Sequence, residues 1–268
     1  MKVKELTCKT ALSPSKLPGL DYALNPYSGC GHQCTYCYVP TVLHLPRQTW
    51  GETIYVKRNL PRVLAKELLK KKPGVVGIST VTDPYQPVEQ TYHITRYCLQ
   101  QLKKYDFPVQ IQTKSTLVLN DLLLIEDCFK PEIMISIGTI NDSQRKILEP
   151  CASSIADRLR ILDALKNNEK IKTSVFLGPL YPDLSWNQIK SLLNMFIEKK
   201  VSTIMIDKFH LKSGLQTYLL PVINNDEILR DAFSAHVFTQ SDWYEKKVNQ
   251  IIQYIYSKSD AIRIKKAF

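Results

Sequence analysis

Long hydrophobic runs are missing from this sequence of 268 residues. No stretch of about 18 consecutive apolar side chains occurs, which excludes the usual pattern of a transmembrane helix. The opening segment, MKVKELTCKT, lacks the apolar stretch of a signal peptide, so we expect a cytoplasmic location. No repeat, low-complexity segment or Gly/Ser-rich linker divides the chain. These absences predict a single domain over residues 1–268, with a core at about 20–210 and a helical cap at about 211–268.

Acidic residues are also scarce. The chain has 25 Asp and Glu against 36 Lys and Arg, which gives a formal net charge of +11. Such a surplus favours a polyanionic partner, and it predicts a DNA or RNA substrate. The basic residues are scattered along the chain, however, so a solvated lysine surface is the alternative explanation.

Six short apolar or β-branched runs have the composition of strands that are buried on both faces. The predicted strands are 23–27, 75–80, 109–113, 133–139, 172–177 and 203–207. Helical patterns separate them, and this alternation is typical of a parallel sheet with right-handed crossovers. The predicted helices are one capped by Asn59, 91–105, one from Asn120 to Cys128, 153–166, 185–199, 226–233 and 243–256. The expected fold class is α/β, a partial (β/α)6 barrel of parallel strands with a C-terminal helical extension, and its chemistry should lie at the C-terminal ends of the strands.

Three of the seven cysteines, Cys30, Cys34 and Cys37, lie within one segment, NPYSGCGHQCTYCYVP. In a reducing compartment such a cluster indicates metal binding or catalysis rather than disulfides. Thiolates suit both iron–sulfur clusters and zinc. A structural zinc site needs four ligands, commonly two separated pairs, and no second pair follows; His32 or Cys8 could still serve as a fourth ligand. A 4Fe–4S cluster with three cysteine ligands would keep one iron open, which is typical of catalysis.

The spacing of these cysteines, with Tyr36 directly before the last of them, resembles the signature of the radical S-adenosylmethionine (SAM) superfamily. The flanking segments NPYSGC, CTYCY and TDPYQPVEQTYHITR resemble the spore photoproduct lyase-like, DNA repair photolyase-related branch, from about Leu24 to Leu180. The resemblance implies a radical SAM enzyme with a 4Fe–4S cluster and SAM as cofactors, which cleaves SAM to a 5′-deoxyadenosyl radical that abstracts a substrate hydrogen. It also implies a reductant such as ferredoxin or flavodoxin.

The resemblance assigns roles to individual residues. Cys30, Cys34 and Cys37 would be the cluster ligands, and Tyr36 would contact the adenine of SAM. Lys114, after the third predicted strand, would pair with the SAM carboxylate, and Ser136 would contact the ribose or the carboxylate. Thr80, Thr82 and Asp83 occupy the place where many members recognise the SAM amino group with a Gly-Gly-Glu segment, and Asp83-Pro84 departs from that pattern. The remaining assignments of this kind are Tyr38 as a hydrogen-atom relay, Glu149 with Arg158 as an ion pair, and Glu89 and Arg96 as partners of each other or of the substrate.

One departure concerns the hydrogen donor. Spore photoproduct lyase carries a cysteine just after its second strand, where this chain has Ser79-Thr80. A hydroxyl is a much poorer hydrogen-atom donor than a thiol, so the reaction of the lyase is not expected here. Cys151 is the candidate catalytic thiol near the active face, whereas Cys98 and Cys128 are expected to be buried small hydrophobes.

Three functions remain open from the sequence. The first is a radical SAM enzyme that repairs or modifies nucleic acid. The second is a radical SAM enzyme acting on a small metabolite or peptide. The third is a non-catalytic metal protein that binds nucleic acid, against which the SAM-site matches at Tyr36, Lys114 and Ser136 argue.

Overall fold

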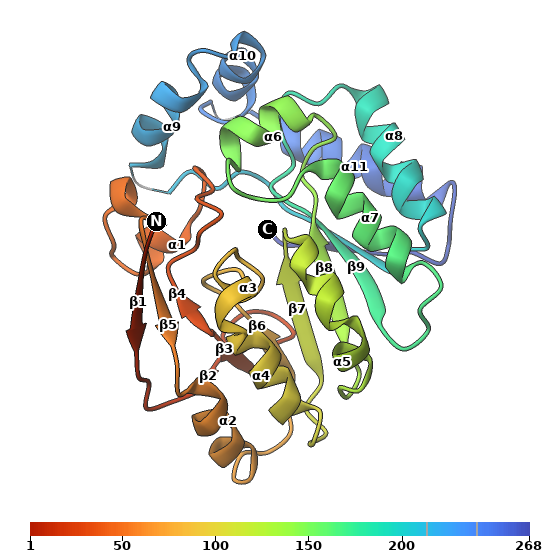
Figure 1. Ribbon diagram of the computed structural model, residues 1–268. Helices are drawn as coiled ribbons and strands as arrows, with labels where there is room; N and C mark the ends of the chain where they lie inside the picture. The colour runs from red at the N-terminus through yellow and green to blue at the C-terminus, as the bar shows by residue number, and fades with distance from the viewer. Residues whose placement is uncertain (213, 240) are drawn as a thin grey trace. The chain divides into compact units, whose positions relative to one another are not determined.

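The computed structural model describes residues 1–212, 214–239 and 241–268. These residues form two compact units, and their helices and strands are labelled in Figure 1. The first unit contains residues 1–33, 45–134 and 168–172, and the second contains residues 34–44, 135–167 and 173–268. Strand β8 (Glu132–Ser136) passes from the first unit into the second, and the cysteine segment does so between Gln33 and Cys34. Each unit is described by itself below.

The main sheet of the first unit has the strand order β2-β3-β6-β7, followed by the start of β8. The strands are β2 (Leu12–Pro14), β3 (Tyr22–Leu24), β6 (Val76–Ile78) and β7 (Val109–Thr113). Strands β3, β6 and β7 are parallel, and β2 runs antiparallel to β3 at the edge. All three residues of β6 are buried. This agrees with its apolar sequence, which predicted a strand of a sheet covered on both faces.

The helices of the first unit follow its strands. They are η1 (Arg47–Thr49), α2 (Leu60–Leu68), α3 (Glu89–Tyr92), α4 (Ile94–Leu102), η2 (Thr116–Asp121) and α5 (Leu122–Glu126). Helices α2 and α4 pack against each other (Figure 1). The predicted helix 91–105 is wrong at its start, because His93 adopts a left-handed conformation that separates α3 from α4.

Two predicted N-caps differ from the structure. Asn59 precedes α2, but its side chain makes no cap bond; it accepts from the Cys8 N–H and donates to the Cys8 carbonyl, both at 2.8 Å. Asn120 lies inside the 3-10 turn η2, and α5 starts only after Asp121. Both asparagines lie near a helix start, but neither caps it. The Asn59 side chain bonds to the Cys8 backbone instead, and Asn120 is part of the tighter 3-10 turn that precedes α5.

A second, smaller sheet in the first unit was not predicted. Its order is β1-β5-β4, formed by β1 (Lys2–Leu6), β5 (Thr53–Lys57) and β4 (Tyr27–Ser28). Strand β1 is parallel to β5, and β4 is antiparallel to it. The alternation in β5 buries Ile54 and Val56 and leaves Tyr55 exposed, so one face of this sheet is solvated.

The second unit continues the strand order from β8 through β9 (Lys172–Leu177) and β10 (Thr203–Ile206) to β11 (Arg263–Lys266). Strands β9, β10 and β11 are parallel. Its helices are α1 (Val39–Val42), α6 (Asp142–Leu148), α7 (Ile155–Leu165), α8 (Trp186–Glu198), α9 (Leu215–Ile223), α10 (Glu227–His236) and α11 (Trp243–Tyr256). Ser154 caps α7, one residue after the predicted start, and Ser185 forms a capping box with Gln188 at the start of α8.

The α/β fold class with parallel strands and a helical C-terminal region is confirmed. All six predicted strands are present, and β7 and β9 have the predicted bounds. The sequence reasoning missed β11, α6 and α9, and the single-domain organisation stays a prediction. No helix in the described ranges is both long and apolar enough to cross a membrane.

Candidate active site

The first cysteine of the segment is held in the first unit by the turn that follows β4. Gly29 has φ +87°, and a Cβ at this position would lie 2.6 Å from the Thr53 carbonyl oxygen, so only glycine fits. The buried Gln86 side chain accepts from the Gly31 N–H at 2.7 Å and donates to the Gly29 carbonyl at 3.3 Å. Cys30, which lies between these two glycines, is thereby buried in a turn of fixed shape.

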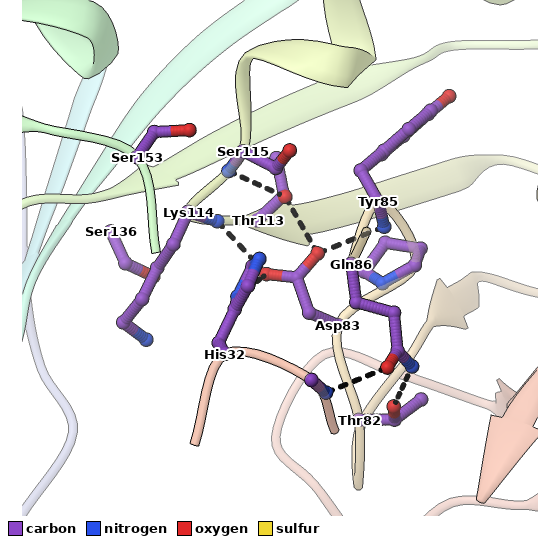
Figure 2. A network of polar contacts seen from close by, with 12 residues as sticks. His32, Thr82, Asp83, Tyr85, Gln86, Thr113, Lys114, Ser115, Ser136 and Ser153 are labelled. Carbon is purple, nitrogen blue, oxygen red and sulfur yellow. Dashed lines mark hydrogen bonds and ion pairs between the residues drawn. The ribbon is translucent and has the colours of Figure 1, made fainter. Parts of the chain in front are cut away.

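Asp83 is the centre of a polar network at the ends of β6 and β7 (Figure 2). Its Oδ2 lies 3.3 Å from His32 Nδ1 and accepts from the Lys114 N–H at 2.9 Å. Its Oδ1 accepts from the Thr113 hydroxyl at 2.7 Å and from the Tyr85 N–H at 2.9 Å. Burial by itself would raise the pKa of Asp83, but the positive charge of His32 and these hydrogen bonds lower it to about 2. Asp83 therefore joins the cysteine segment to the end of β7.

Thr82 and Lys114 lie beside this network. The Thr82 hydroxyl donates to the Gly29 carbonyl at 2.6 Å and accepts from Gln86 at 2.9 Å. Lys114 is half-buried directly after β7, at the strand end where it was expected. The assignments of Thr82, Asp83 and Lys114 to SAM stay predictions, and the structure adds protein partners for Asp83 that the sequence did not reveal.

A second buried carboxylate, Glu149, holds the other end of the cysteine segment in the second unit. The Tyr36 hydroxyl donates to Glu149, and the Arg158 guanidinium pairs with the same carboxylate. Arg158 also donates to the Ser136 carbonyl at 2.9 Å and to the Ser153 carbonyl at 3.0 Å. Burial and then the charge of Glu149 raise the pKa of Tyr36 well above its usual range. The predicted Glu149–Arg158 ion pair is confirmed, and it fixes Tyr36 directly before Cys37.

Aromatic rings surround Tyr36. It makes edge contacts with Tyr181 and Phe209, at centroid distances of 6.4 and 5.3 Å. Tyr181 is fully buried, and its hydroxyl has no hydrogen-bond partner among the described residues. The sequence reasoning did not single out Tyr181; its position shortly after β9, at the end of a parallel strand, was the signal available.

The remaining predicted residues lie in the second unit with different exposures. Ser136 is buried at the end of β8, whereas Tyr38 and Cys151 are exposed. Cys34 and Cys37 are half-buried, and the Cys37 N–H donates to the Cys34 carbonyl at 3.1 Å. The roles proposed for these residues stay predictions.

Three other expectations have clear outcomes in the first unit. Cys98 and Cys128 are buried, as expected for small hydrophobes, and burial raises the pKa of Cys128 to about 12. Of the two alternatives for Glu89 and Arg96, an ion pair between their side chains is not found among the described residues, because Arg96 Nε donates to Asp121 at 2.6 Å; contact with a substrate stays a prediction. Glu89 instead accepts from the Tyr27 hydroxyl and from the backbone at the start of α4.

The donor set fits an iron–sulfur cluster, because one segment supplies three thiols and thiolates are the usual ligands of such clusters. Within the described ranges, no three His, Cys, Asp or Glu side chains converge as a metal site, so the cluster assignment rests on the motif and the family. The sequence profile of the Radical SAM superfamily matches residues 24–196, which include all three cysteines. The chain belongs to the radical SAM superfamily.

Individual relatives agree with this membership. An uncharacterised protein of Methanocaldococcus jannaschii is 32% identical over 185 residues, which are 69% of this chain and 70% of the relative. The spore photoproduct lyase of Clostridium acetobutylicum is 24% identical over 94% of this chain and 73% of its own. A radical SAM Nα-GlyT isomerase of Pseudomonas phage M6 is 26% identical over 59% of this chain and 33% of its own.

Solved structures show the same fold. A spore photoproduct lyase with bound AdoMet and dinucleoside spore photoproduct matches with a TM-score of 0.72 and 14% identity, over 98% of this chain and 81% of that chain. As a member of this superfamily, the protein is a radical SAM enzyme with a 4Fe–4S cluster and SAM as its cofactors, and it shares the fold of spore photoproduct lyase. Enzymes of this type need a reductant.

Proposed function

We propose that this radical SAM enzyme acts on nucleic acid, in a repair or modification reaction. The observation that carries the proposal is the likeness to spore photoproduct lyase along nearly the whole chain, because a solved lyase holds a dinucleoside photoproduct. The net charge of +11 supports the same substrate class, since nucleic acids are polyanions.

The residues of this chain would divide the work as follows. The cluster and SAM, when bound, supply the 5′-deoxyadenosyl radical that abstracts a substrate hydrogen. Cys30, Cys34 and Cys37 would bind the cluster. Tyr36, held by Glu149, would contact the adenine. The other SAM contacts we propose come from Thr82, Asp83, Lys114 and Ser136, and Tyr38 and Cys151 are the candidates for returning a hydrogen atom to the product.

The reaction itself is proposed to differ from that of spore photoproduct lyase. Ser79-Thr80 would occupy the place of the lyase's hydrogen-donating cysteine. Ser79 is buried, with φ 67°, and its hydroxyl has no partner among the described residues. An O–H bond donates a hydrogen atom far less readily than an S–H bond. A substrate radical formed here would therefore need another donor or would rearrange, and the phage isomerase relative is consistent with the second outcome.

The test uses the anaerobically reconstituted protein with SAM and dithionite. Deuterated DNA and RNA oligonucleotides are supplied in turn, and 5′-deoxyadenosine is analysed by mass spectrometry. Deuterium in 5′-deoxyadenosine is expected from a nucleic acid, and the Cys34→Ala variant should form no 5′-deoxyadenosine. Deuterium acquired only from a deuterated metabolite or peptide would overturn the proposed substrate class and favour the alternative enzyme.

A further inference from the structure

The small sheet of the first unit presents one solvated face. In its register Lys2 lies opposite Thr53, Lys4 opposite Tyr55, and Tyr55 opposite Ser28 on the other side. Paired residues of neighbouring strands point to the same face, so these five side chains share one surface. The burial pattern of β5 identifies it as the outer surface, because Tyr55 is 38% exposed whereas the intervening Ile54 and Val56 are fully buried. We call Lys2, Lys4, Ser28, Thr53 and Tyr55 the lysine–tyrosine face.

The first 72 residues, which include this face, carry most of the net positive charge of the sequence. Residues 1–72 contain 12 Lys and Arg against 4 Asp and Glu, a surplus of 8 out of the total of 11. Within β1 the acidic Glu5 points to the opposite side from Lys2 and Lys4, and it lies 3.5 Å from Arg58. Lys57 is half-buried and donates to the Asn25 carbonyl at 2.9 Å, so it does not contribute to the face. The charged residues on the outer side of β1 are therefore Lys2 and Lys4, both cations.

Edge lysines alone have a simpler explanation. Strand β1 is an edge strand, and lysines on edge strands prevent pairing with other chains. That explanation does not account for Tyr55, an exposed aromatic ring on the neighbouring strand directly beside Lys4. Cationic side chains next to an exposed ring are the combination that binds single-stranded nucleic acid, with the charges on the phosphates and the ring against a base.

The lysine–tyrosine face is also continuous in sequence with the cysteine segment, because β4 leads directly into it. Strand β4 carries Ser28 on the lysine–tyrosine face, and Cys30 follows two residues later in the same unit. Gly29, between them, is fixed against the Thr53 carbonyl of β5. A nucleic-acid strand bound on this face would thus be held next to Cys30, the first of the three expected cluster ligands.

We propose that the lysine–tyrosine face binds single-stranded nucleic acid beside the cluster segment. Lys2 and Lys4 contact phosphates, and Tyr55 stacks on an unpaired base. This inference rests on the proposed nucleic-acid function and assigns it a binding surface.

The test measures binding of a fluorescein-labelled 12-nucleotide single strand to the reconstituted holoenzyme by polarisation, between 50 and 200 mM salt. Lys2→Gln/Lys4→Gln should weaken binding about tenfold and reduce the slope of log K against log salt by about 1.4, because each lysine–phosphate contact contributes about 0.7 for a single strand. Tyr55→Ala should weaken binding about tenfold with an unchanged slope, since stacking is not ionic. Tyr55→Phe keeps the ring and should bind within about twofold of the wild type.

The matched control is Lys258→Gln/Lys266→Gln, which removes the same charge from two exposed lysines of the second unit, one of them on the edge strand β11. It should bind within about twofold of the wild type. Equal losses of affinity in both double variants would mean that binding depends only on the net charge. That result would overturn the proposed binding surface and leave the proposed nucleic-acid function standing. If Lys2→Gln/Lys4→Gln changed only the rate at which flavodoxin reduces the holoenzyme, the proposed binding surface would also be overturned, and the face would be a site for the reductant. Failure of the wild-type protein to bind any strand would overturn both proposals.

Discussion

The two ends of the cysteine segment are held by different kinds of carboxylate site. In the first unit, Asp83 interacts with four groups: the N–H groups of Tyr85 and Lys114, the Thr113 hydroxyl and the His32 ring. In the second unit, Glu149 is held by two long side chains, Tyr36 and Arg158, and Arg158 is fully buried. Asp83 is thus held by several uncharged donors as well as by His32, whereas Glu149 is paired with the fully buried cation Arg158.

This difference between the two carboxylate sites matters because each site holds a different part of the cysteine segment in place. Asp83 holds His32, between the first and second cysteines, and Glu149 holds Tyr36, directly before the third. A buried ion pair is costly to break from one side, because the remaining charge stays buried without compensation. We therefore expect the Glu149 site to be the more sensitive of the two, and the predictions below test this ranking.

The largest effect is expected from Arg158→Met. Removal of the guanidinium leaves Glu149 buried without its cation, so the free energy of unfolding should fall by about 3–5 kcal/mol. Urea unfolding measures the change. The control is Arg160→Met on the same helix, where the pair with Asp157 is solvated and Arg160 is 72% exposed, so its loss should stay within about 0.5 kcal/mol. Similar losses in the two variants would contradict the sensitivity expected of the buried Glu149–Arg158 pair.

Asp83→Asn should have the next largest effect and a distinctive pH dependence. The pKa of Asp83 is about 2 in the folded chain against 3.8 ordinarily, so ionisation of this carboxyl favours folding. The shift corresponds to about 2 kcal/mol, fully present above about pH 5 and lost as the pH falls toward 2. Urea unfolding of the apo chain, which avoids acid loss of the cluster, should show a gap between wild type and variant that narrows below pH 4. A gap that is constant with pH would refute the assignment.

Tyr36→Phe should cost about 2 kcal/mol, because the variant loses a hydrogen bond to a charged group while its ring contacts remain. Tyr244→Phe is the matched control: Tyr244 donates to the neutral Leu180 carbonyl at 3.0 Å, and its loss should cost about 1 kcal/mol. Thermal or urea unfolding of both variants gives the comparison. An equal cost would show that the charge of Glu149 adds nothing to its bond with Tyr36.

The sequence predicted the scaffold and the cysteine segment better than these two sites. Buried parallel strands are recognisable in a sequence as short apolar runs, and the spacing of the three cysteines is specific to few kinds of metal site, so both features were predicted. The Glu149–Arg158 pair was anticipated through the family resemblance. The Asp83 site was missed in its actual form, because His32, Asp83 and Thr113 come from three segments that are far apart in the sequence. The small sheet was missed because β4 has two residues and β1 is exposed throughout most of its length, so neither has a buried periodicity.

The smallest effect is expected from Tyr181→Phe. Tyr181 lies in the same aromatic cluster as Tyr36, but its buried hydroxyl has no partner among the described residues. Removing an unsatisfied polar group relieves a desolvation cost, so the free energy of unfolding should change by less than about 0.5 kcal/mol or rise by up to about 1 kcal/mol. Urea unfolding beside Tyr36→Phe measures the contrast between two neighbouring phenols. A loss above 1 kcal/mol would mean that the Tyr181 hydroxyl is satisfied, for instance by an ordered water, and that Glu149 is not the only polar anchor of this cluster.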